Sequence, residues 1–333
     1  MKKTLIALAA VAAVSASFAQ SSATIYGIAD MYVGKASTSA NGVTTSTGGA
    51  VANGGMSTSR LGFKAVEDMG QGMSATVVVE TAVVMDTPAA TSLGARVATL
   101  TFASGANSLT LGTQYTPALS YVACNSAIGC HNQDVSGVNS SVRNNNAVSY
   151  NYNGSGLSIK VMAAFKEDGT FEGGNAGSFT GIGGTYTAGA LVIGAAIESD
   201  SVATAGSTAS NLTGLSATYN FGAFQLGGLA TSLRNAGNLD ASNRQGLGLQ
   251  VGVPFNNGQN AFHVSYSSNA ASGAASSSTT TALSGLLNHN LSKTANVFAF
   301  YNQSTQDQNA GLYTGGTANR VTTTMGVGAR KSF

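Results

Sequence analysis

The chain has 333 residues and is poor in charge, because only 8% of them are charged, against about 25% in ordinary soluble domains. Its 15 basic and 13 acidic residues nearly cancel, which excludes a basic nucleic-acid-binding protein and a polyanion-coated surface protein. The 43 glycines and only 3 prolines argue against a helical protein and against a disordered linker.

The amino terminus has the layout of a secretory leader. Lys2 and Lys3 make a positive start, residues 5–14 are an apolar stretch too short to span a bilayer as a helix, and residues 17–19 form a small-x-small cleavage signature. This pattern predicts a signal peptide over residues 1–19, and we find no later segment with the composition of a transmembrane helix. Such an exported chain is destined for the periplasm, the cell exterior or the outer membrane.

Residues 20–333 are expected to form one all-β domain, a transmembrane antiparallel β-barrel. Strand candidates come in pairs, in which a short Gly/Asn/Asp turn joins the two members and a long polar connection leads to the next pair. Bacterial barrels of one chain have an even strand number, and roughly twenty residues for each strand and its connection predict about sixteen strands. The expected strands are 24–35, 60–66, 73–84, 95–103, 108–115, 147–152, 157–165, 178–187, 191–198, 212–219, 224–233, 246–253, 261–266, 279–288, 296–302 and 320–333.

The connection over residues 116–143 is the longest, the third of the long loops, and it carries both cysteines. Cys124 and Cys130 lie six positions apart in an exported chain, which favours a disulfide that would stiffen the loop. The alternative is a metal site formed by these two thiols and His131, but zinc usually takes four ligands and no fourth lies close in sequence.

The last strand alternates over its whole length. From Val321 to Phe333 the odd positions are largely apolar and the even positions are small or polar, which is typical of a strand with different solvents on its two sides. Phe333 is the last residue, and a terminal aromatic residue suits the interfacial girdle of an outer-membrane barrel.

Six segments carry a likeness to a known family. They are Ala23-Thr-Ile-Tyr-Gly-Ile-Ala-Asp30, Ser59-Arg-Leu-Gly-Phe-Lys-Ala-Val-Glu-Asp-Met-Gly-Gln-Gly72, Leu109-Thr-Leu-Gly-Thr-Gln-Tyr-Thr-Pro117, Asn145-Asn-Ala-Val-Ser-Tyr150, Asn288-His-Asn-Leu-Ser-Lys-Thr-Ala295 and the final 327–333. Together they resemble the Gram-negative general porins of the neisserial and burkholderial type, over essentially the whole mature chain. This resemblance implies a sixteen-stranded barrel, a homotrimer, and a third loop that folds inward and narrows the pore. At Thr113 and near Ser149 the family often has basic residues, so the charge preference must be argued from this chain's own residues.

Charged residues in the wall segments are candidates for the pore lining. Arg60 and Lys64 share one face of a strand whose other face carries Leu61, Phe63 and Ala65, so we expect both to point into the lumen. Further candidates are the basic Arg96, Arg143 and Lys160 and the acidic Asp30, Glu80 and Asp134. A basic wall that faces acidic groups across a narrow gap would create a transverse field, and the excess of basic candidates predicts a weak anion preference. Alternatively, these charges pair with one another or only solvate the lumen.

The predicted function is passive diffusion of small hydrophilic solutes and ions across the outer membrane of a Gram-negative bacterium, with outer-membrane lipid and lipopolysaccharide as surroundings. No enzyme activity, cofactor, metal or nucleic acid is expected. The alternatives are a substrate-specific channel, a β-barrel adhesin without a pore, and a barrel hydrolase. The hydrolase is disfavoured because we find no Gly-x-Ser-x-Gly elbow beside the three histidines, which are His131, His263 and His289.

Overall fold

The computed structural model describes residues 21–40, 42–46, 48–87, 93–125, 141–165, 177–202, 208–236, 242–273, 278–307 and 320–333. The predicted signal peptide, 1–19, lies outside the described residues. The elements are β1(Ser22–Ala40), β2(Val43–Ser46), β3(Ala50–Asn53), β4(Arg60–Gly70), β5(Met73–Ala82), β6(Val97–Ser104), β7(Asn107–Tyr115), η1(Leu119–Ala123), β8(Arg143–Gly154), β9(Leu157–Ala164), β10(Gly177–Ala188), β11(Leu191–Val202), β12(Ser210–Asn220), β13(Gln225–Arg234), β14(Asn243–Phe255), β15(Asn260–Ser272), β16(Ser278–Asn290), β17(Ala295–Gln306) and β18(Arg320–Ser332).

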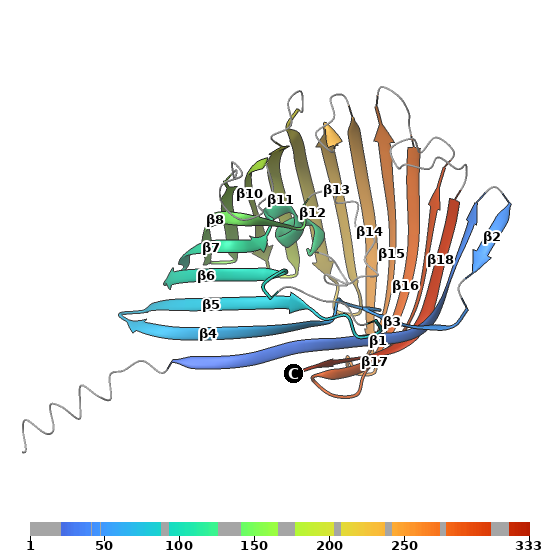
Figure 1. Cartoon of the computed structure of the whole chain (residues 1–333), viewed down its shortest axis with the longest axis horizontal. Helices are drawn as coiled ribbons and strands as arrows, with labels where there is room; N and C mark the ends of the chain where they lie inside the picture. Colours follow the sequence, from blue (N-terminus) through green and yellow to red (C-terminus); the bar gives the residue numbers. More distant parts are fainter. Residues whose placement is uncertain are drawn as a thin grey trace, which may run out of the picture.

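Sixteen of the described strands form the wall of a closed antiparallel barrel, as the sequence predicted. From β4 to β18 each strand pairs with the next, and β1 closes the ring by pairing with β4 on one edge and with β18 on the other (Figure 1). The short strands β2 and β3 were not predicted. They lie in the first long connection. Both pair with residues 31–40 of β1, beyond the segment of β1 that pairs with β4.

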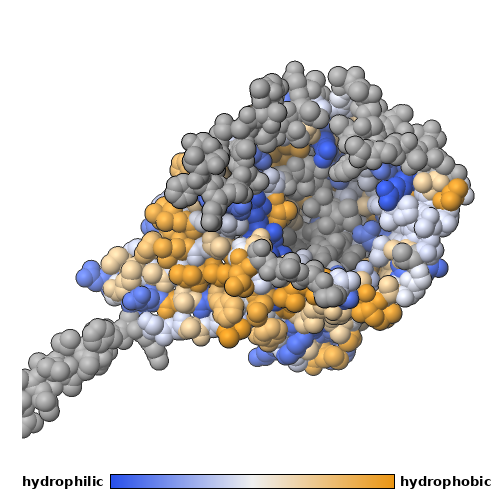
Figure 2. Space-filling view, viewed as in Figure 1, coloured by the Kyte–Doolittle hydropathy of each residue, from blue (hydrophilic) through white to orange (hydrophobic). Residues whose placement is uncertain are grey.

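Alternation along the strands separates an apolar outer face from an inner face of small and polar residues. On β11, Ile193 and Ile197 are exposed, whereas Ala196 and Glu198 are buried. Figure 2 shows apolar side chains gathered over the outer surface of the near wall, around a hollow interior. This is the pattern of a barrel that has lipid outside and water inside. Within the described residues, no helix is both long and apolar enough to cross a membrane.

Tight turns join the strand pairs where the sequence predicted them. Gln71 and Gly72 between β4 and β5 have φ values of 54° and 75°, and Ser155 and Gly156 between β8 and β9 have φ values of 53° and 77°. Two consecutive positive φ values match the right-handed twist of the flanking strands, which is why glycine is favoured in these turns. The long connections therefore lie at the opposite end of the barrel.

The carboxyl terminus takes part in closing the barrel. Phe333 exchanges two backbone hydrogen bonds with Gly27 of β1, at 3.0 and 3.1 Å. Its side chain remains exposed on the outer face, next to the end of the wall. The role of this terminal aromatic residue at a membrane interface stays a prediction.

Candidate functional site

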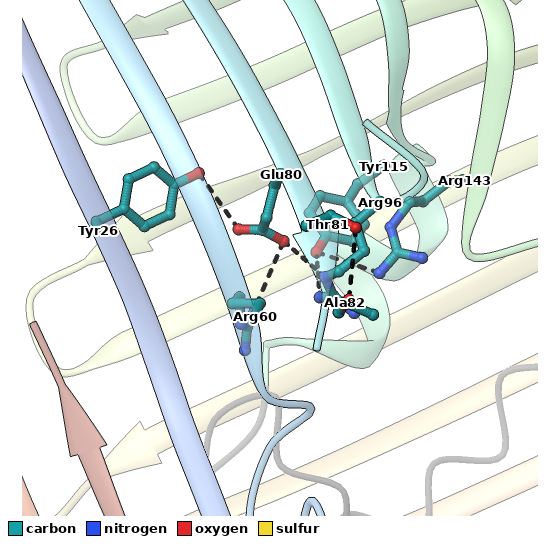
Figure 3. A network of polar contacts seen from close by, with 8 residues as sticks. All are labelled: Tyr26, Arg60, Glu80, Thr81, Ala82, Arg96, Tyr115 and Arg143. Atoms are coloured by element: carbon teal, nitrogen blue, oxygen red, sulfur yellow. Dashed lines mark hydrogen bonds and ion pairs between the residues drawn. The ribbon is translucent and has the colours of Figure 1, made fainter. Parts of the chain in front are cut away.

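Glu80 on β5 lies among basic residues of the neighbouring strands. Its Oε1 accepts a hydrogen bond from Arg96 Nε at 2.7 Å and lies 3.8 Å from Arg60 Nη1, while its Oε2 accepts a bond from Tyr26 Oη at 3.3 Å (Figure 3). Glu80 and Arg96 are 7% and 9% exposed. A buried carboxylate needs such partners because it has lost its hydration.

Tyr115, the last residue of β7, extends this network to β8. Its hydroxyl oxygen accepts hydrogen bonds from Arg96 Nη2 at 3.1 Å and from Arg143 Nη2 at 3.4 Å. The Arg143 guanidinium also stands 4.7 Å from the centre of the Tyr115 ring, in cation–π geometry. We call Arg60, Arg96 and Arg143, with Glu80 and Tyr115, the basic cluster. It holds three guanidinium groups and one carboxylate.

Tyr115 joins the cluster from the last position of β7. Simple alternation along β7 would place it with Leu109 and Leu111, whose side chains are exposed on the outer face. The extra residue of the register shift lies on β8, because Gly112 and Gln114 pair with Ala147 and Asn144, and Gln114 stays on the inner face, where it accepts a hydrogen bond from Ser149. Tyr115 departs from the alternation where β7 ends and the third connection begins, so the alternation pattern did not predict its place in the cluster.

The first part of the third long connection packs against the inner face of the wall. We call residues 116–125 the loop foot. Lys160 Nζ on β9 donates a hydrogen bond to the carbonyl oxygen of Tyr115 at 2.8 Å, and Ala118 N donates one to Glu198 Oε1 on β11 at 2.6 Å. Glu198, which was not among the predicted site residues, is 3% exposed. These two charged side chains fix the chain where it leaves β7.

Apolar packing and further polar contacts hold the rest of the foot. Ala118 and Val122 of the foot form a buried cluster with residues of β11 to β13 and of the segment after β13, namely Ala196, Leu212, Leu229, Leu233 and Ala236. Ser216 Oγ donates to the carbonyl oxygen of Tyr121 at 3.1 Å, and Asn125 Nδ2 donates to Ser216 Oγ at 3.0 Å. Burial raises the pKa of the Tyr121 phenol. The remainder of the predicted inward loop, residues 126–140, lies outside the described residues.

Gly194 on β11 allows the foot to lie against the wall, which gives a testable prediction. A Cβ at this position would overlap the carbonyl oxygen of Tyr121. We expect Gly194→Ala to displace the foot and to lower the free energy of unfolding by about 2 kcal/mol, as overpacking does. Urea unfolding of the refolded barrel measures this. Gly285→Ala is the matched control, since a Cβ there meets nothing within 4 Å, and an equal effect of both variants would contradict the prediction.

Asp30 on β1 was predicted to belong to the pore lining, and in the structure the first long connection covers its carboxylate. It is 0% exposed, and its carboxylate accepts backbone hydrogen bonds from Gly55 at 2.8 Å, Met56 at 3.0 Å and Ser57 at 2.7 Å. Ser59 Oγ receives a further bond from the backbone N–H of Asp30 at 2.9 Å. The negative charge is therefore engaged by the first long connection.

Glu80 and Asp30 do not face the arginines across a gap, as the transverse-field hypothesis required. Glu80 is bonded to Arg96, and Asp30 lies on the strand that pairs with β4, which carries Arg60. These two carboxylates thus belong to the same part of the wall as the basic cluster. Lys64 is exposed on β4, on the same strand face as Arg60.

Three residues of the predicted sites lie outside the part of the chain that the structure describes, namely Asp134, Cys130 and His131. The disulfide of Cys124 with Cys130 therefore stays a prediction. Among the residues that the structure describes, no group of three or more His, Cys, Asp or Glu side chains could hold a metal ion.

Comparison with known proteins supplies a family. A family profile described as Gram-negative porin matches residues 4–309. The outer membrane porin protein 32 of Delftia acidovorans is 49% identical to this chain over 80 residues, which cover 22% of this chain and 20% of that relative. The chain thus aligns with about one fifth of the length of this curated relative.

Solved structures resemble the barrel over its whole extent. The anion-selective porin from Comamonas acidovorans superposes with a TM-score of 0.75 at 23% identity, covering 94% of this chain and 100% of that one. In vitro folded OmpT of Vibrio cholerae, in its trimer form, superposes with a TM-score of 0.69 at 15% identity, covering 94% and 99%. At these identities the likeness establishes the fold.

Proposed function

The chain belongs to the Gram-negative porin family, and from this premise we propose that it forms a water-filled diffusion channel in the outer membrane with a preference for anions. Barrels of sixteen strands enclose an interior wide enough for water and small solutes. Ions and small hydrophilic molecules then cross passively, and side chains at the narrowest level select among them by size and charge.

The observation that carries the anion preference is the composition of the basic cluster. Its three guanidinium groups exceed its one carboxylate by two positive charges. Two further inner carboxylates, Asp30 and Glu198, hold connecting segments, and each has a cation beside it, Arg330 and Lys160, so they leave this excess unchanged. A fixed excess of positive charge in a confined aqueous space raises the local concentration of anions and repels cations. The printed description of the Comamonas structure as anion-selective supports the same proposal.

We further propose that the third connection narrows the channel and that three copies assemble. The loop foot already lies against the inner face of β10 to β12, which supports an inward course for the loop. The trimer form printed for Vibrio cholerae OmpT supports the assembly. The expected surroundings are outer-membrane lipid and lipopolysaccharide, after removal of the predicted signal peptide.

Planar-bilayer recording under a salt gradient tests the proposal. With purified, folded protein we expect conductance to rise in groups of three equal steps and the reversal potential to have the anion sign. A cation sign would contradict the assigned role of the basic cluster. Folded barrel that gives no conductance at all would contradict the diffusion function itself. Single steps in place of triplets would contradict the trimer alone.

A further inference from the structure

Residues 54–59 leave the wall of the barrel between β3 and β4. Asn53, at the end of β3, pairs with Met31, and Arg60, at the start of β4, pairs with Ile28. Only two residues of β1 separate these partners, whereas six residues connect Asn53 to Arg60. The six residues cannot continue the flat row of strands, so they must bulge out of it. We call this segment the insert.

The insert bulges toward the inner face, and Asp30 anchors it there. The three backbone N–H groups of Gly55, Met56 and Ser57 converge on the Asp30 carboxylate, and the backbone N–H of Gly54 donates to the Asp30 carbonyl oxygen at 2.8 Å. Hydrogen bonds to a charged acceptor are stronger than neutral ones, and here they occupy a fully buried group. Asp30 therefore defines the shape of the insert.

The insert packs against an apolar patch on the inner wall. Met56 is 2% exposed and packs with Leu286, Phe298 and Phe300, while Tyr32 meets Phe300 edge to face at 5.0 Å between ring centres. Large apolar side chains on the water side of a barrel cost free energy unless they are covered. The insert covers them, so the patch and the insert stabilise each other.

The insert and the loop foot lie on opposite walls. β11, which binds the foot through Glu198, is the same number of strand pairings from β1 in both directions around the ring. The strands of the basic cluster, β4 to β8, lie between these two inward segments on one side of the barrel.

We propose that the Asp30-anchored insert is a second narrowing element of the channel, opposite the third connection, and that it also sets the position of Arg60, which follows it directly. This inference rests on the proposed channel function. Asp30 then acts as a positioning residue. The width of the channel depends on both inward segments, and the first connection contributes to it although its sequence resembles an ordinary polar loop.

Chemical labelling tests the anchor without reference to conduction. In a C124S/C130S background, M56C is expected to react with a water-soluble maleimide at least about tenfold more slowly than T45C, which lies on the exposed strand β2. Adding Asp30→Ala should accelerate labelling of M56C by about tenfold. Asp68→Ala is the matched control. It removes the same charge, but Asp68 accepts a backbone bond from Gly70 at the exposed end of β4.

Conductance tests the narrowing. Deletion of residues 55–58 leaves Gly54 and Ser59 to connect β3 to β4, which matches the two residues of β1 between the partners of Asn53 and Arg60. This deletion is expected to raise single-channel conductance by about 1.5-fold. Fast labelling of M56C with Asp30 intact, or no acceleration by Asp30→Ala, would overturn the anchored insert. A folded, heat-modifiable deletion variant with unchanged conductance would overturn the narrowing. If the parent protein does not conduct, the proposed function fails, whereas the labelling rates still decide whether the insert is anchored.

Discussion

Replacing Arg60 and Arg143 together by glutamate is expected to reverse the sign of the ion preference. The basic cluster now holds three guanidinium groups and one carboxylate, and the double variant R60E/R143E would hold one guanidinium and three carboxylates. The fixed charge at this level changes from plus two to minus two. Because a confined site concentrates ions of the opposite charge, we expect the anion-to-cation permeability ratio to fall by about tenfold. The reversal potential in a potassium chloride gradient measures this ratio.

The matched control for that prediction is R234E/R320E. It makes the same change in net charge at two exposed positions, the end of β13 and the start of β18, outside the basic cluster. We expect this control to keep the reversal potential of the parent within a few millivolts, because charges beyond about one Debye length are screened. Equal shifts in both double variants would mean that total charge, and not the cluster, sets the preference.

The wall of the barrel could be predicted from the sequence because alternation is a local property. Each strand from 60–66 to 320–333 shows its two faces in its own residues, and the turns between partners carry their own Gly and Asn signals. Residues 36–40 of β1, with β2 and β3, were missed. Residues 36–40 are mostly Ser, Thr and Ala, which resemble a polar loop, and their pairing depends on partners that the sequence does not single out.

The candidate site could be predicted only in part. Arg60 lies where alternation expects it, because β4 is regular around this residue. Glu80 was predicted as a charge of the lining, but the order of strands around the ring places it beside the arginines. Tyr115 was missed because its side chain departs from the alternation where β7 ends, and Glu198 because its partner is a backbone amide far away in sequence. Non-local partners of this kind are not visible in a periodic pattern.

The role of Asp30 illustrates the same limit. Its position in an alternating strand predicts that its side chain lies on the inner face, and the structure places it there. Whether such a charge meets water or protein depends on the course of a connection, and here three of the six residues between β3 and β4 donate their backbone N–H groups to the carboxylate. A polar connection rich in Gly, Ser and Thr gives no sign that it returns to the wall.

Replacing Glu80 by alanine is expected to lower stability and to increase anion preference at the same time. The buried Arg96 guanidinium would lose its closest partner, and Arg60 and Arg143 would remain nearby with the same charge. Removing one partner of a buried ion pair leaves an uncompensated charge, so we expect the free energy of unfolding to fall by about 3 kcal/mol. The fixed positive charge rises from two to three, and the reversal potential should move further in the anion direction.

A double-mutant cycle separates these two effects. If Glu80 acts through Arg96, E80A/R96A should lose less stability than the sum of its two single variants, with a coupling free energy above about 1 kcal/mol. Its cluster would also return to a charge of plus two, so its reversal potential should resemble that of the parent. Urea unfolding and bilayer recording on the same four proteins give both quantities. Additive stabilities, or an E80A reversal potential equal to the parent's, would show that Glu80 and Arg96 do not work as the pair that their 2.7 Å contact indicates.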